Sequence, residues 1–335
     1  MICTRRDFAR TVGVAAGAGV LVGQKPPATR IDVHHHLCPP EYRKAVEPRA
    51  IPGIVWPAWS PEQSVQEMDR NGVAASMLSL SPPGIWYGDV QQGRALSRIV
   101  NEYGARMVHD FPGRFGLFAA LPLPDIEGSL REIAWAFDTL KAEGIGLFTS
   151  YGNAWLGDPA FAPVWEELNR RKAVVYTHPN IPACCGSLIP DVGPGTVEYS
   201  TDTTRTIASL VFSGTAARYP DIRWIFSHGG GTMPFLISRF GRQGEQLKDR
   251  AQRLPNGVMY ELRKFYYDIA QANHPAALNA LLQLVPPAQI LFGSDYPYRP
   301  ESEVVAGLAA HKFAAAGLRA INRDNLLRLI PQLRA

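Results

Sequence analysis

The sequence predicts an α/β protein, a closed (β/α)₈ TIM barrel with long loops over the face at which its strands end. Three observations predict this fold in the 335-residue chain. Short apolar runs alternate with longer amphipathic stretches eight times, two connecting segments are long, and histidines follow the first apolar run. An open doubly wound sheet is the alternative, but it would normally carry a glycine-rich phosphate turn at that place.

Eight apolar runs have the length of buried parallel strands. They are Ile31–Val33, Ala75–Leu80, Phe115–Ala119, Gly144–Phe148, Val174–Thr177, Trp224–Phe226, Phe265–Asp268 and Ile290–Phe292. Uninterrupted alternation of strands and helices indicates a parallel sheet. Eight repeats are the number that closes a barrel, in which catalytic groups lie where the strands end.

The amphipathic stretches between these runs predict the helices of the barrel. They are Glu62–Arg70, Gly93–Asp110, Ile126–Lys141, Pro159–Arg171, Thr203–Tyr219, Thr232–Lys248, Pro275–Leu284 and Ser302–Ala315. Ser60 and Pro61 precede the first of them, as a capping residue and a proline at the first helical position. Gly72 stands where that helix should end.

Two connecting segments are unusually long. Residues 37–61 carry Trp56 and Trp59, and residues 180–202 carry the neighbours Cys184 and Cys185. Both segments follow strands, so we expect them to cover the site, and surface loops without a function are the alternative. A bond between adjacent cysteines is strained, so the sequence predicts no disulfide framework.

The chain begins with a segment typical of twin-arginine export signals. Arg5 and Arg6 precede Phe8 and a mildly apolar run over residues 11–23. We therefore expect residues 1–29 to be a signal segment that directs the protein to the periplasm, and residues 30–335 to form the barrel. A basic N-terminal helix on a cytoplasmic protein is the alternative.

Composition argues against two kinds of partner. The formal net charge is +4, and three of these charges belong to the predicted signal segment, which leaves no basic surface typical of nucleic-acid binding. No segment reaches the roughly 20 apolar residues of a membrane span.

Three of the eight histidines are consecutive, namely His34, His35 and His36. Side chains of a strand alternate between its faces, so His34 and His36 project together and can grip one metal ion. Asp32 has the same parity and could orient a ligand.

Three further residues stand where predicted strands end. His178 follows the fifth strand, His228 the sixth and Asp295 the eighth. In a barrel these side chains converge at the mouth with the histidine pair of the first strand. Imidazole and carboxylate ligands suit Zn²⁺, Mn²⁺ or Fe²⁺. The fourth predicted strand ends without the lysine or glutamate that would bridge two ions, which favours a single ion.

We assign the metal ligands as His34, His36, His178 and Asp295. His228 is then an acid, a base or a substrate contact. For His228 the alternative is a structural residue braced by the three glycines that follow it.

The motifs IDVHHHLCPP, THPN, SHGGG and GSDYP, in this order, resemble those of the amidohydrolase superfamily. The likeness runs from about Ile31 to Pro300. It is closest to the mononuclear branch of aminocarboxymuconate-semialdehyde-decarboxylase-like proteins, the amidohydrolase-2 type. Within that branch, ASMLSLSPPG, GLFTSYG and WLGDPAF look most like 6-methylsalicylate decarboxylases. The match to the superfamily is highly specific, and the match to one substrate is not.

The resemblance implies one divalent ion, Zn²⁺ or Mn²⁺, bound by the four residues assigned above, with His228 acting in catalysis. Most members of the branch release CO₂ from unsaturated or aromatic carboxylic acids. The resemblance also implies that Arg239 contacts the substrate carboxylate, in some members across the interface of a homodimer. Arg205 and Arg299 compete for this role.

These residues suit the redox-free decarboxylation of a salicylate-like acid, with the metal as Lewis acid and Asp295 or His228 as the proton source. Trp56, Trp59, Trp86 and Tyr151 could form a stacking wall, and plain packing is the alternative for each. Hydrolysis of a lactone or amide at the same site is the competing function. A non-catalytic metal-binding protein is the third possible function, and the complete set of metal ligands argues against it.

Overall fold

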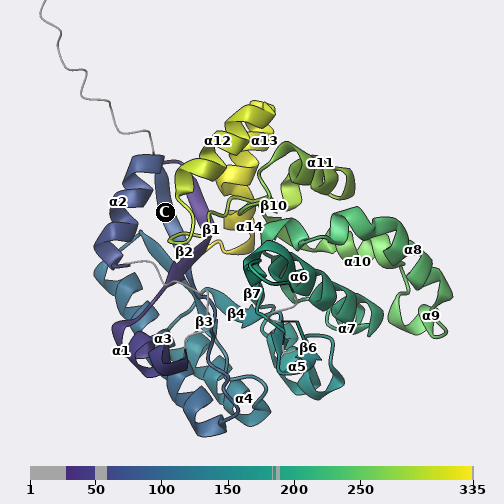
Figure 1. Cartoon of the computed structure of the whole chain (residues 1–335), viewed down its shortest axis with the longest axis horizontal. Helices are drawn as coiled ribbons and strands as arrows, with labels where there is room; N and C mark the ends of the chain where they lie inside the picture. The colour runs from purple at the N-terminus through teal and green to yellow at the C-terminus, as the bar shows by residue number, and fades with distance from the viewer. Residues whose placement is uncertain (1–27, 50–58, 183, 186–188, 334–335) are drawn as a thin grey trace, which may run out of the picture.

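The computed structural model describes residues 28–49, 59–182, 184–185 and 189–333. Its centre is an eight-stranded parallel sheet in the order β1-β2-β3-β4-β7-β8-β9-β10. The strands are β1 (Arg30–Leu37), β2 (Val73–Leu80), β3 (Phe115–Ala120), β4 (Gly144–Phe148), β7 (Val174–His178), β8 (Arg223–Phe226), β9 (Tyr266–Asp268) and β10 (Ile290–Leu291). Helices surround this sheet (Figure 1), so the predicted (β/α)₈ barrel is confirmed.

Hydrogen bonds beyond the end of β10 join the last strand to the first. The Asp295 N–H donates to the His34 carbonyl, and the His36 N–H donates to the Tyr296 carbonyl, both at 2.8 Å. These bonds close the sheet into a barrel. They also attach the segment that carries Asp295 to the strand that carries the histidine pair.

Every predicted strand is present, and β1 differs most from its prediction. It runs on to Leu37, so the three consecutive histidines lie inside a strand that is buried after its first residue. Polar side chains are tolerated in such a strand because each of them has partners.

Eight helices correspond to the predicted ones. They are α2 (Pro61–Asn71), α3 (Val90–Asp110), α4 (Ile126–Ala134), α5 (Ala162–Arg170), α6 (Pro194–Phe212), α8 (Ile237–Gln246), α11 (Pro275–Leu284) and α12 (Glu301–His311). The Ser60 side chain accepts from the Gln63 N–H at the start of α2, and Gly72 ends this helix with a φ of 66°.

Both segments predicted to be loops are partly helical. α1 (Pro40–Val46) lies in the first, and α6 begins at Pro194 in the second, ahead of its predicted start at Thr203. Each helix begins with proline and has few apolar residues on its inner face. The helical spacing of apolar residues was therefore too weak to predict it from the sequence. α7 (Thr215–Arg218) lies within the helix predicted over Thr203–Tyr219. Other short elements without a prediction are β5 (Ser150–Tyr151), β6 (Ala154–Trp155), α9 (Arg250–Arg253), α10 (Val258–Lys264), α13 (Ala315–Arg319) and α14 (Asn325–Leu329).

A disulfide joins the neighbours Cys184 and Cys185. Because its ends are neighbours in the chain, the bond ties no separate elements together and is not a framework.

The end of the barrel at which the strands begin is packed with apolar side chains. Leu326 and Leu329 of α14 join a buried cluster with residues of six strands. Arg223, the first residue of β8, donates to the Leu329 carbonyl oxygen at 2.8 Å. The polar residues of interest therefore gather at the opposite end.

None of the described helices combines the length and apolarity needed to cross a bilayer. The predicted signal segment lies outside the described residues apart from its last two, and its role stays a prediction.

Candidate metal centre

The four predicted metal ligands meet at the mouth of the barrel. Asp295 Oδ1 lies 3.0 Å from His36 Nε2 and 3.2 Å from His34 Nε2. His178 Nε2 is 4.0 Å from the same oxygen. All four side chains are buried. His34, His178 and Asp295 belong to a group whose ligand atoms all lie within 4.8 Å of one another, and the fourth member of that group is His228. His36 Nε2 lies 3.1 Å from His34 Nε2. Imidazole and carboxylate donors of this kind suit Zn²⁺ or Mn²⁺.

Hydrogen bonds behind each ring determine which nitrogen faces this point. Asp268 Oδ2 lies 3.0 Å from His34 Nδ1, and backbone carbonyl oxygens lie 3.2 Å from His36 Nδ1 and 2.8 Å from His178 Nδ1. Carboxylate and carbonyl oxygens only accept, so each Nδ1 carries a proton and each Nε2 is the nitrogen that can coordinate a metal ion. The residues therefore fit a metal ion held through three Nε2 atoms.

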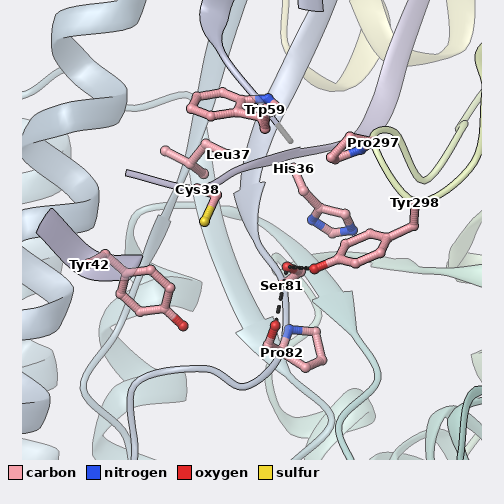
Figure 2. Close-up of a pocket in the computed structure, with 9 residues that line it drawn as sticks. All are labelled: His36, Leu37, Cys38, Tyr42, Trp59, Ser81, Pro82, Pro297 and Tyr298. Atoms are coloured by element: carbon pink, nitrogen blue, oxygen red, sulfur yellow. Dashed lines mark hydrogen bonds between the residues drawn. The ribbon is translucent and has the colours of Figure 1, made fainter. Parts of the chain in front are cut away.

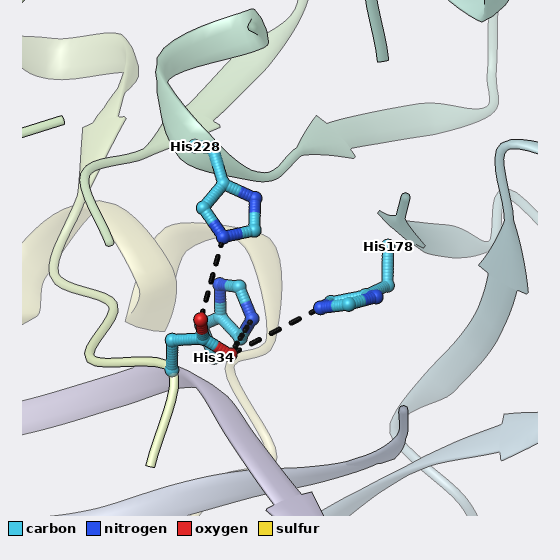
Figure 3. A group of neighbouring side chains, drawn as sticks. His34, His178 and His228 are labelled. Atoms are coloured by element: carbon cyan, nitrogen blue, oxygen red, sulfur yellow. Dashed lines mark ion pairs between the residues drawn. The ribbon is translucent and has the colours of Figure 1, made fainter. Parts of the chain in front are cut away.

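His228 completes the group from the turn after β8. Its Nε2 lies 3.5 Å from Asp295 Oδ2, and its ring centre lies 4.9 Å from that of His34. Figure 3 shows the rings of His34, His178 and His228 around one carboxylate, with ion pairs to its two oxygens. The carboxylate of Asp295 thus presents Oδ1 to the predicted ligands and Oδ2 to the predicted catalytic histidine.

Burial and mutual contact set the charges of this cluster. Burial lowers the pKa of His36, and it holds the pKa of His178 well below its ordinary value, so both rings are neutral and free to coordinate. Burial alone would raise the pKa of Asp295, but His34 and bonds from other histidines keep it well below its usual range.

His34 differs from the other two predicted histidine ligands. Burial opposes a charge on its ring, yet the carboxylates of Asp268 and Asp295 raise its pKa to about 10. A metal ion must therefore displace a proton from this ring, which makes metal binding dependent on pH.

Three residues of the site have left-handed backbone conformations. The φ angles are 53° at His228, 52° at Gln271 and 70° at Asp295. Residues with a side chain rarely adopt this conformation, and it gathers at functional sites. Gln271 Nε2 donates to Asp295 Oδ2 at 2.5 Å, so it holds the oxygen that faces His228.

A cavity of about 660 Å³ opens beside these residues. His178, His228 and Asp295 form its floor, and Tyr199 of α6 and Tyr298 form part of its wall. No lysine or arginine is among the described residues that line it. A substrate carboxylate in this cavity would therefore depend on a bound cation and on neutral hydrogen-bond donors.

A small niche lies next to His36. Its volume is about 10 Å³, and its wall includes Cys38, Trp59, Ser81 and Tyr298 (Figure 2). The hydroxyl groups of Ser81 and Tyr298 are 2.8 Å apart. The niche has room for about one water-sized group. Trp59, predicted as part of the stacking wall, thus lies near the predicted metal ligand His36.

The other predicted substrate contacts lie apart from the large cavity. Arg239 is exposed on α8 and lines a different pocket. Trp86 and Tyr151 line a separate cavity of about 330 Å³. Trp56 lies outside the described residues. Their contact with substrate therefore stays a prediction.

The two arginines that compete with Arg239 have acidic partners. Arg205 lies 3.6 Å from Glu198 and 3.7 Å from Asp202. Arg299 lies 2.8 Å from Glu303. Neither lines the large cavity.

Sequence analysis missed Asp268 and Gln271. Asp268 ends the seventh predicted strand, so the criterion that selected His178 would have found it. No sequence signal marks Gln271, because its partner Asp295 lies 24 residues away. Glutamine also does not predict a left-handed backbone conformation.

Comparison with known proteins identifies relatives over nearly the whole barrel. A family model described as Amidohydrolase matches residues 31–329. The decarboxylase macB of Penicillium terrestre is 37% identical over 326 residues, which cover 91% of this chain and 96% of that protein. The 6-methylsalicylic acid decarboxylase of Penicillium expansum is 34% identical over 315 residues, which cover 91% of this chain and 97% of that protein.

Solved structures agree with the fold. A crystal structure of an amidohydrolase II superposes with a TM-score of 0.84 at 28% identity and covers 90% of this chain and 99% of its own. A dihydroxybenzoic acid decarboxylase from Polaromonas sp. JS666, solved with bound manganese, superposes with a TM-score of 0.77 at 21% identity and covers 91% and 98%. With a family match over residues 31–329 and a barrel that carries its polar cluster where the strands end, this chain belongs to the amidohydrolase family.

Proposed function

We propose that this protein is a metal-dependent carboxy-lyase that removes CO₂, without a redox step, from a small aromatic acid of the salicylate type. The observation that carries the proposal is the shared carboxylate of Asp295, which faces three metal-competent imidazoles with one oxygen and His228 with the other. The names of the relatives, which are decarboxylases at 34–37% identity, support the same chemistry.

A single divalent ion, Zn²⁺ or Mn²⁺, is the proposed cofactor, held by His34, His36, His178 and Asp295. When bound, it would supply the Lewis acidity and positive charge that the described lining of the cavity lacks. The manganese in the Polaromonas relative supports Mn²⁺, and three imidazoles and a carboxylate are donor types that would also hold Zn²⁺.

The hydroxyl groups of Tyr199 and Tyr298 would orient the substrate in the cavity. Burial raises the pKa of Tyr298 to about 12 and raises that of Tyr199 further, so both stay protonated and can donate hydrogen bonds near neutral pH. Gln271 keeps Asp295 Oδ2 directed toward His228.

His228 is the proposed proton donor, with Asp295 as its partner. Its Nε2 lies 3.5 Å from Asp295 Oδ2 and lines the cavity. Proton transfer to the ring carbon that bears the carboxylate interrupts aromaticity. The C–C bond then breaks, CO₂ leaves, and the electron pair of that bond restores the aromatic ring. One proton is consumed in each turnover, and His228 regains it from solvent.

The test is a CO₂-release assay on the full chain loaded with Mn²⁺ or Zn²⁺. We expect CO₂ from 2-hydroxybenzoates and little from 3-hydroxybenzoate, which lacks the ortho hydroxyl group. His228→Asn should abolish release while the protein keeps its metal. Release of acid from lactones, with no CO₂ from any hydroxybenzoate, would replace this proposal with hydrolysis.

We also propose that residues 1–29 export the folded protein to the periplasm by the twin-arginine route. Arg5, Arg6 and the apolar run that follows support this proposal. Replacement of both arginines by lysine should leave the protein in the cytoplasmic fraction. An unchanged distribution between the fractions would refute export through this signal.

A further inference from the structure

Asp268 is a fully buried carboxylate at the end of β9 that contacts two functional residues, His34 of β1 and His228 of the turn after β8. Its Oδ2 lies 3.0 Å from His34 Nδ1 and 3.2 Å from the Tyr176 hydroxyl. Its Oδ1 accepts the backbone N–H groups of His228 and Ala270, both at 3.0 Å. Four donors therefore saturate one side chain whose relative exposure is 0%.

The contact with Oδ2 determines the form of the His34 ring. A carboxylate oxygen can only accept, so the proton must lie on His34 Nδ1. When a metal ion displaces the second proton of the ring, Nε2, which lies 3.2 Å from Asp295 Oδ1, is left with the lone pair that coordinates. The opposite tautomer would point an N–H at the predicted metal position and prevent coordination.

The contact with Oδ1 acts on the other side of the site. His228 has a φ of 53°, a conformation that needs support from its surroundings. The bond from its N–H to Asp268 supplies such support directly at the strained residue. The ring of His228 is thereby kept with its Nε2 3.5 Å from Asp295 Oδ2.

We propose that Asp268 is a positioning residue that sets the tautomer of the metal ligand His34 and, through its second oxygen, the backbone of the proton donor His228. The inference rests on the metal site of the proposed function and not on its reaction. It concerns a side chain that touches neither the metal position nor the cavity.

Asp268→Asn tests this role because the amide keeps the size of the carboxylate but cannot accept with both ends. If the amide oxygen keeps the two backbone N–H groups, its NH₂ group faces His34 Nδ1 and forces the proton onto Nε2. If the amide instead rotates by 180°, its NH₂ group faces the two backbone N–H groups, and donors then face donors. The first arrangement keeps more hydrogen bonds and is therefore expected. Because it places a proton on His34 Nε2, the affinity for Zn²⁺ should fall about 10–100-fold.

Zn²⁺ affinity is measured on the full chain by competition with a chromophoric chelator. Tyr176→Phe is the matched control, because it removes the other donor to Oδ2 and leaves the His34 contact intact, and its Zn²⁺ affinity should stay near that of the wild type. Circular dichroism of the metal-free variants checks that each is folded. Wild-type affinity in a folded Asp268→Asn protein would overturn the inference and leave the proposed function standing.

A second measurement decides the matter even if Asp268→Asn does not fold. A two-bond ¹H–¹⁵N correlation spectrum of the zinc-loaded wild-type protein reports which nitrogen of each imidazole carries its proton. We expect His34 to be protonated on Nδ1, and protonation on Nε2 would overturn the inference. Failure of the wild type to bind Zn²⁺ or Mn²⁺ would overturn both this inference and the metal site of the proposed function.

Discussion

Asp295 holds the centre of the site because its two carboxylate oxygens have different partners. Oδ1 faces His34 and His36, whereas Oδ2 faces His228 and accepts from Gln271. A carboxylate held from both sides cannot rotate freely, so the proposed metal binding and proton transfer would use separate oxygens. Residues that hold Oδ2 should therefore affect the reaction more than they affect the metal.

Gln271→Leu removes one of the groups that hold Oδ2 at nearly constant size. A hydrogen bond to a charged group contributes about 1.5–3 kcal/mol, which predicts a loss of about 10–100-fold in kcat. The metal content should stay near that of the wild type, because the contacts of Oδ1 are unchanged. Steady-state kinetics and metal analysis check both statements. Gln66→Leu on the exposed side of α2 is the control, and an unchanged kcat in Gln271→Leu would contradict the role.

Glu301, at the start of α12, should make the stability of the protein depend on pH. Burial, and then the neighbouring carboxylate of Asp32, raises the pKa of Glu301 well above 4.5, its ordinary value. The folded protein therefore holds a proton that the unfolded chain releases above that pH. Stability must fall as the pH rises from this value toward the folded pKa, by at most about 1.4 kcal/mol per pH unit.

Glu301→Gln removes this titration, so the variant should gain in thermal midpoint over the wild type as the pH is raised from 5 to 8. Melting curves at several pH values measure the difference. Glu303→Gln is the matched control on the same helix, where the carboxylate is partly exposed and paired with Arg299. A constant difference between Glu301→Gln and the wild type across this range would show that Glu301 is ionised in the folded protein.

At the scale of elements, the ends of the strands were predictable and the starts of two helices were not. Strand ends followed from apolar runs, and barrel closure made His34, His178 and Asp295 neighbours without any further information. α6 was predicted late because its first turns, TVEYSTDTT, hold polar residues that make no clear apolar stripe. Asp268 bonds to a ring 234 residues away, a distance over which no local pattern acts.

The glycine triplet after His228 lets the turn that carries this residue approach α6 closely. Gly231 has φ 66° and ψ −133°, and an added Cβ would lie 2.0 Å from the Ser200 carbonyl oxygen of α6. Gly231→Ala must therefore push α6 away from the turn that carries His228, at a cost of at least about 2 kcal/mol. Because Tyr199 lines the cavity from the same helix, kcat/KM should fall as well.

Urea unfolding and kinetics of Gly231→Ala measure the two effects, with Gly241→Ala as the control. An added Cβ at Gly241 meets no atom within 4 Å, and the residue lies inside α8, so alanine should stabilise the protein by up to about 1 kcal/mol. Equal urea midpoints for the two variants would show that α6 can move away from residue 231 without a loss of stability.

At the scale of the whole molecule, the arginine that the family resemblance assigns to the substrate lies away from the large cavity. The cavity has metal-competent residues, tyrosine hydroxyls and an amide, but its described lining has no cationic side chain. Arg239, which the family resemblance assigns to the substrate carboxylate, lies exposed on α8 and makes no ion pair with the described residues. Phe235, four residues earlier, is 85% exposed. An exposed aromatic side chain beside an unpaired arginine is typical of a protein interface.

We propose that Arg239 acts on the cavity of a second copy in a homodimer, and complementation can test this. Arg239→Ala and His228→Asn should each be nearly inactive alone. Co-expressed in equal amounts, they form hybrid dimers in which one cavity has both His228 and the partner's arginine, so about a quarter of the wild-type activity should return. Arg242→Ala, one turn away on the same helix, is the control and should stay active alone. If Arg239 acted within its own chain, or if the protein were a monomer, mixing would restore nothing.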